Sequence, residues 1–93
     1  MIYAYASLTV TDPEKLAAYR GHAADALAKH GGQLAAAGAD FTVLDGAPNQ
    51  PNVAAIMTFP DRDAALGWIN DPELADIHAL RRGAGQSDIL LLG

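Results

Sequence analysis

Polar and apolar side chains alternate through the first ten residues of the chain. Apolar residues occupy the even positions, at Ile2, Ala4, Ala6, Leu8 and Val10. The odd positions carry side chains with a polar atom, at Tyr3, Tyr5, Ser7 and Thr9. A repeat of two residues is typical of a β-strand with one buried face, so this pattern predicts a strand over residues 2–10.

The pattern then changes to a helical one. Asp12 can accept hydrogen bonds from the free amides of a helix start, and Pro13 suits the first helical position. Apolar or aromatic residues follow at helical spacing, at Leu16, Tyr19, Ala23 and Leu27. Gly31 is expected to end this helix in the left-handed conformation.

Two further strands are predicted in the middle of the chain. Residues 33–38 and 41–45 together predict one strand that small residues interrupt, with a bulge near Gly38. The prolines within residues 46–52 indicate a turn. The apolar run over residues 53–59 predicts the third strand.

A second helix with a break is predicted next. Asp61 is expected to cap it, and Asp71-Pro72 repeats the aspartate-proline start of the first helix, so a short helix restarts there. Gly83 and Gly85 are expected to stop this short helix. Residues 87–92 then predict the last strand.

These elements follow the order β-α-β-β-α-β in a single domain over residues 1–93, because two cores would not fit in a chain of this length. The order predicts a ferredoxin-like α+β fold with both helices on one face of the sheet. The strands over residues 53–59 and 87–92 are apolar on both faces, so the sheet needs a second cover. The simplest cover is the sheet of a second copy, which would give a homodimer. The alternative is that exposed aliphatic side chains are tolerated, as on most protein surfaces.

Composition argues against several classes of protein. Cysteine is absent, which excludes disulfides and thiolate chemistry and fits a reducing cytoplasm. A net charge of −5 with only six Lys and Arg residues argues against nucleic acid binding, which needs a basic face. No run of about 18 apolar residues is present, so no membrane-spanning helix is expected.

Metal and cofactor sites are not expected either. The chain has three histidines, His22, His30 and His78, and the first two lie about 80° apart around a helix rather than on one face. Three or four converging ligands therefore cannot be identified. The Gly31-Gly32 pair follows a helix instead of opening one, which argues against a phosphate loop.

Two groups of residues could form a binding site. His78, Arg81 and Arg82 lie within about one helical turn and could form a positive patch that holds a carboxylate. The same residues would also suit a solvated face at a helix end. Aromatic rings with one polar tip can line a pocket or fill a core. The rings considered for a pocket belong to Tyr5, Tyr19 and Trp68.

A set of residues spread over nearly the whole chain carries a family resemblance through its order and spacing. The set comprises Tyr3, Val10, Asp12-Pro13, Tyr19, His30-Gly31-Gly32, Gly38, Asp45-Gly46, Phe59-Pro60, Ala64-Ala65, Trp68 and Arg81. In these residues the chain resembles the domain-of-unknown-function 1330 family, within the dimeric α+β barrel superfamily. The resemblance implies a ferredoxin-like protomer whose sheets pair face to face, and it brings no established reaction.

The resemblance has gaps where a pocket could lie. Gln33 and Ala37 stand where basic residues are usual, and Ile69 and Leu74 stand where aromatic residues are usual. Each change removes a polar or aromatic group. Arg81, in contrast, falls where the family pattern carries an arginine.

Two functional hypotheses from different classes follow, and the sequence leaves open whether the protein is an enzyme. In the first, a small dimeric barrel binds or transforms a small apolar or aromatic molecule without a cofactor. His22 would act as general base and Arg81 would stabilise an enolate-like oxyanion. The ligand would contact Tyr5, Tyr19, Trp68 and His78. In the second, the protein is a non-catalytic dimeric accessory or interaction module. The resemblance adds haem handling as a third option, since some superfamily members have it. A walled cavity above about 300 Å³ would favour the first hypothesis.

Overall fold

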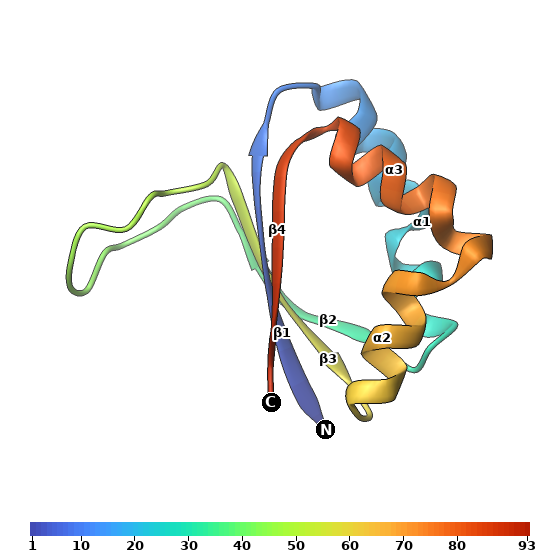
Figure 1. Cartoon of the computed structure of the whole chain (residues 1–93). Helices are drawn as coiled ribbons and strands as arrows, with labels where there is room; N and C mark the ends of the chain where they lie inside the picture. The colour runs from blue at the N-terminus through green and yellow to red at the C-terminus, as the bar shows by residue number, and fades with distance from the viewer.

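The chain folds into a four-stranded sheet with three α-helices and one 3-10 helix, and the computed structural model describes all residues from Met1 to Gly93. The elements are β1 (Ile2–Val10), α1 (Pro13–Ala28), β2 (Gln33–Gly38), β3 (Val53–Phe59), α2 (Arg62–Asn70), η1 (Pro72–Leu74), α3 (Ala75–Gly83) and β4 (Gly85–Leu92). The sheet is antiparallel with the strand order β2-β3-β1-β4, and the helices all cover one of its faces (Figure 1). The predicted α+β order and its two layers are thus confirmed. None of the helices has both the length and the apolar character needed to cross a membrane.

The predicted helix boundaries are confirmed by their hydrogen bonds. Asp12 accepts a hydrogen bond from the backbone N–H of Lys15 at 3.2 Å, and Asp61 accepts one from Ala64 at 2.8 Å. These contacts satisfy amides that have no partner inside the first helical turn. At the end of α1, Gly31 adopts a φ of 73°, in the left-handed region that favours glycine.

Asp71 ties the end of α1 to the break between α2 and η1. One carboxylate oxygen accepts a hydrogen bond from the N–H of Glu73 at 2.8 Å, which caps η1. The other lies 2.7 Å from Nζ of Lys29 and 2.8 Å from Nε2 of His30. The hydrogen bonds from Lys29, and then from His30, hold the pKa of the Asp71 carboxyl well below its usual range. The carboxylate therefore stays ionised and holds the end of α1 beside the start of η1.

The predicted extension of the second strand is wrong. β2 ends at Gly38, the register shift lies between Leu34 and Ala36 rather than near Gly38, and residues 41–45 form no strand. Continuing the β2–β3 register would place residue 41 opposite Pro51, which has no N–H to donate to a ladder. The segment between β2 and β3 instead extends away from the helix layer (Figure 1).

Alternation along the strands separates two faces of the sheet. On the helix-facing side, Ala4 and Leu8 of β1 are buried. On the other side, which we name the free face, Tyr5 pairs with both neighbouring strands and the central side chains are mainly apolar. These side chains are Tyr3, Tyr5, Ile56, Leu90 and Leu92. Leu90 is 64% exposed, so nothing in the chain covers the free face.

His78 fastens α3 to the end of α2. Its Nε2–H donates to the backbone carbonyl of Trp68 at 2.8 Å, and its Nδ1 accepts from Nη1 of Arg81 at 2.7 Å. The side chain is fully buried. Burial, and secondarily the charge of Arg81, lowers the pKa of His78 below its ordinary 6.5. The imidazole is therefore neutral in the folded protein.

This buried neutral histidine should make stability depend on pH. The unfolded chain takes up the proton near pH 6.5, whereas the folded chain takes it up only at lower pH. Stability is therefore complete above that value and falls as the pH is lowered below it. The variant His78→Gln should be less stable than the wild type at about pH 8, by roughly 1–2 kcal/mol for the altered hydrogen bonds.

Urea unfolding at several pH values tests this expectation. The stability gap between the wild type and His78→Gln should narrow between about pH 6.5 and pH 5, because only the wild type pays this protonation penalty. His22 and His30 are present in both proteins, so the difference isolates His78. Two curves that stay parallel over this range would contradict the assignment of a neutral buried imidazole.

Replacing each of two glycines by alanine should change the stability of the protein in opposite directions. A Cβ on Gly85 would overlap the backbone carbonyl of Thr9, where β4 begins beside β1. Gly85→Ala should destabilise the protein by more than about 2 kcal/mol. Gly21 lies inside α1 with open space around it, so Gly21→Ala should stabilise it by about 0.5–1 kcal/mol. Thermal unfolding of both variants checks the opposite signs, and destabilisation by Gly21→Ala would refute this account.

Candidate functional site

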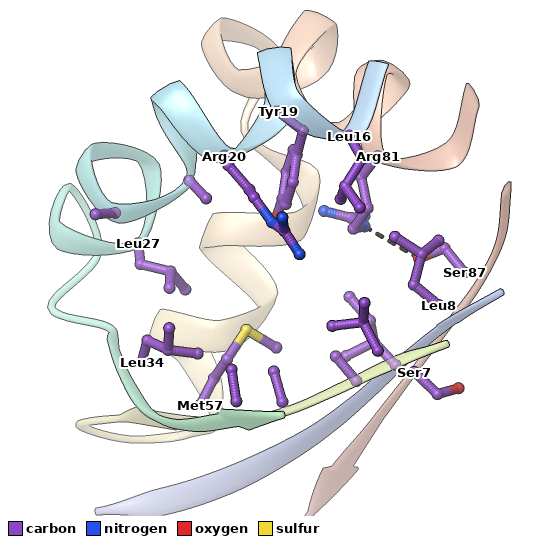
Figure 2. A pocket seen from close by; sticks show the side chains of 17 residues that line it. Ser7, Leu8, Leu16, Tyr19, Arg20, Leu27, Leu34, Met57, Arg81 and Ser87 are labelled. Carbon is purple, nitrogen blue, oxygen red and sulfur yellow. Dashed lines mark hydrogen bonds between the residues drawn. The ribbon is translucent and has the colours of Figure 1, made fainter. Parts of the chain in front are cut away.

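A cavity of ≈ 320 Å³ lies between α1 and the helix-facing side of the sheet (Figure 2). Of its 17 lining residues, 13 are hydrophobic, so most of its wall suits an apolar molecule. The volume lies just above the lower end of the range for ligand pockets, roughly 300 Å³. It can therefore hold a small ligand only.

Small side chains leave this space open. The lining includes five alanines from both layers, Ala6, Ala23, Ala24, Ala37 and Ala55. Larger side chains fill the layer on either side of them. Leu8 and Leu16 belong to one core cluster, whereas Leu27 and Met57 belong to another. The two clusters support α1 above the sheet, and the alanines between them are too short to close the gap.

The cavity opens to solvent between α1 and β2. β2 is an edge strand, and its two lining residues, Leu34 and Ala37, are exposed. From the helix side, Arg20 and Ala24 are also exposed. A ligand can therefore enter at this edge without any element moving.

Arg81 supplies the cavity with a buried charge. Its Nε donates to Oγ of Ser87 at 3.2 Å, and its Nη1 donates to Nδ1 of His78 at 2.7 Å. The guanidinium carbon lies 5.6 Å from the ring centroid of Tyr19 and 5.4 Å from that of Trp68, close enough for cation–π attraction to both rings. Only 6% of Arg81 is exposed. The guanidinium is therefore fixed in one position.

The lining has positive charge and no negative charge. No aspartate or glutamate lines the cavity, and the ion pairs of the structure do not include Arg81. Nη2 of Arg81 has no hydrogen-bond partner within the chain. Arg20, which also makes no ion pair, reaches into the same space from α1 (Figure 2).

His78 holds Arg81 but cannot serve the cavity directly. A carbonyl oxygen only accepts and a guanidinium only donates, so Nε2 must carry the proton and Nδ1 must be bare. Both ring nitrogens are thereby engaged, with Trp68 and with Arg81. Burial lowers the pKa of His78 and so favours the neutral ring, and the two partners fix its tautomer. His78 therefore orients Arg81, and it has no atom free for a ligand or for proton transfer.

The structure brings four of the predicted site residues together. Arg81 and Tyr19 line the cavity, whereas Trp68 and His78 lie in the second layer around the guanidinium. The rings of Trp68 and His78 meet edge to face, with centroids 4.7 Å apart. Nε1 of Trp68 is buried and has no hydrogen-bond partner.

Three of the residues considered for a site lie elsewhere. His22 is exposed on α1 and does not line the cavity, because two residues beyond Arg20 its side chain points about 200° around the helix from Arg20. Tyr5 projects from the free face, on the opposite side of the sheet from the cavity. Arg82 is exposed, so it does not join His78 and Arg81 in one patch. The cavity thus contains no histidine.

Sequence reasoning missed three polar residues of the lining, Ser7, Arg20 and Ser87. A periodic signal existed for the last two. Arg20 follows Leu16 by four residues and so shares the apolar stripe of α1. Ser87 precedes Ile89 by two residues and therefore shares the helix-facing side of β4.

Comparison with known proteins identifies the fold and the family of the chain. No curated protein sequence matches the chain. Among solved structures, it is similar to the RPA0582 protein of unknown function from Rhodopseudomonas palustris, with a TM-score of 0.78, 19% identity, and coverage of 98% of this chain and 79% of that one. It is also similar to SnoaB, a cofactor-independent oxygenase from Streptomyces nogalater, with a TM-score of 0.70, 17% identity, and coverage of 99% and 90%.

A third similar structure is an antibiotic biosynthesis monooxygenase, with a TM-score of 0.57, 16% identity, and coverage of 100% of this chain and 97% of that one. At these identities the likeness concerns the fold alone, which is the ferredoxin-like fold of the dimeric α+β barrel class. A family model, the domain of unknown function DUF1330, matches residues 1–93. The chain therefore belongs to the DUF1330 family, as its sequence pattern indicated.

Proposed function

We propose that the cavity between α1 and the sheet binds a small, mainly apolar molecule. The observation that carries this proposal is a walled space of ≈ 320 Å³ with a fixed arginine in its lining. Apolar walls with a few well-placed polar groups are typical of small-molecule sites. A filled interior would have favoured the accessory-module hypothesis, and the alanine-lined gap favours ligand binding instead.

Chemistry without a cofactor is the finer part of the proposal. Arg81 is placed to stabilise an oxyanion that develops on a bound molecule, because its Nη2 has no other partner. The similarity of the fold to a cofactor-independent oxygenase agrees with such a role. No histidine reaches the cavity to act as general base, so binding is the function that the geometry supports best.

Filling the cavity should weaken binding. Ala23 faces the cavity from α1 and is half-buried, so Ala23→Leu places a branched side chain in the ligand's space. We expect the affinity for a neutral aromatic probe, 2-naphthalenemethanol, to fall at least about tenfold, as expected for a lost apolar site of this kind. Isothermal titration calorimetry measures the affinity.

The matched control is Ala17→Leu, which makes the same change on the exposed side of α1. It should bind the probe as the wild type does. Circular dichroism on both variants checks that they are folded. Equal affinities of the wild type and Ala23→Leu, or no probe binding by the wild type, would argue against this site.

We also propose that the protein is a homodimer whose two copies pair through the free face. Its central side chains are mainly apolar and all but Ile56 are exposed, and the helix layer covers only the opposite face (Figure 1). Burying such a surface against its own copy is the simplest way to remove it from water. The fold class, in which two sheets can pair face to face, agrees with this arrangement.

A charge on the free face should dissociate the dimer. Leu90→Glu places one carboxylate on each copy near the centre of the proposed contact, where desolvation and mutual repulsion oppose pairing. The control Leu66→Glu changes a leucine that is 40% exposed in the helix layer. Sedimentation at micromolar concentration should show a dimer for the wild type and Leu66→Glu, and a monomer for Leu90→Glu. A monomeric wild type would overturn the proposed pairing.

A further inference from the structure

We propose that the molecule bound in this cavity is a small apolar carboxylate, whose anionic head pairs with Arg81 and Arg20. This inference rests on the proposed binding function and names the class of ligand. It starts from the burial of Arg81. Ninety-four per cent of the residue is out of solvent, with only 6% exposed, and a buried cation is strongly disfavoured unless an anion or many hydrogen bonds replace its hydration.

The partners of Arg81 within the chain are all neutral. They are the hydroxyl of Ser87, the bare Nδ1 of His78, and the ring faces of Tyr19 and Trp68. None of them carries negative charge, and burial, which lowers the pKa of His78, favours its neutral form. These contacts fix the guanidinium and leave Nη2 without a partner in the chain, so this nitrogen can pair with an anion that enters the cavity.

Charge is distributed unevenly between this cavity and the rest of the chain. The sequence has 11 acidic residues and six basic ones, yet two arginines and no acidic residue line the cavity. Figure 2 shows the guanidinium groups of Arg20 and Arg81 on the helix side of the same space. Two cations without an ion pair in a mainly apolar wall favour a ligand with one anionic group.

The remaining lining suits the body of such a ligand. Leu27, Leu34 and Met57 lie across the cavity from Arg81 (Figure 2). The head group would therefore lie inside, against Arg81, and the apolar body would extend toward Leu34 and the opening beside β2. A planar carboxylate matches guanidinium donors well, and burial of its body away from water adds the apolar contribution.

Two nearly isosteric probes separate charge from shape. We expect the wild type to bind 2-naphthoate at least about tenfold more tightly than 2-naphthalenemethanol, since a partly buried charge-assisted pair is worth more than a neutral contact. In Arg81→Gln this preference should shrink to the smaller share that Arg20 contributes, while the alcohol still binds. Arg82→Met removes the neighbouring, exposed arginine outside the cavity, so it should keep the wild-type preference. Calorimetry on each variant gives both affinities.

Arg20→Met keeps the test decisive if Arg81→Gln does not fold, because Arg20 is exposed and tolerant of change. This variant should lower the affinity for 2-naphthoate at least about threefold and leave the affinity for 2-naphthalenemethanol unchanged. A wild type that binds both probes with equal affinity, while Ala23→Leu binds both more weakly, would overturn the carboxylate assignment and leave the binding function standing. Failure of the wild type to bind either probe would overturn both.

Discussion

The guanidinium of Arg81 is the constraint on which the arrangement around the cavity depends. A buried cation loses the water molecules that hydrate it, and groups from the protein have to take their place. Here these groups come from α1, α2, α3 and β4, through Tyr19, Trp68, His78 and Ser87. Each helix is therefore fixed relative to the same charged group. The break at Asp71 contributes as well, because it ends α2 and leaves the Trp68 carbonyl without a helical partner. His78 donates to this carbonyl, and the resulting tautomer presents a bare nitrogen to Arg81.

The cavity exists because packing is satisfied on either side of it rather than within it. Leu16 and Leu27 are buried near the two ends of α1, and between them the alanines Ala23 and Ala24 leave space above the sheet. An unfilled apolar space usually lowers stability, because the side chains around it lose contacts. This chain of 93 residues nevertheless keeps such a space. The space lies beside a charge that is itself costly to bury, so packing is locally poor. Violations of good packing concentrate at functional sites.

The sequence was sufficient for features that depend on neighbouring residues and insufficient for those that depend on distant ones. Asp12, Asp61 and Gly31 act through hydrogen bonds or backbone conformations within a few residues, so their roles could be predicted. The strand over residues 41–45 could not be excluded, because it fails for want of a partner across the sheet. His22 has suitable chemistry, but its direction on α1 leads to solvent. The cavity itself was not predictable, since alanines on separate elements leave a gap only once those elements are packed.

The two proposed surfaces are linked through the pleat of the strands. Ala6 of β1 pairs with Ala55 of β3, and both face the cavity. The next pair along, Tyr5 and Ile56, faces the other way and belongs to the free face. A one-residue slip of β1 would exchange the faces and place a tyrosine where the cavity needs an alanine. The alternation of small and large residues at Ala4, Tyr5 and Ala6 of β1 therefore serves both surfaces at once.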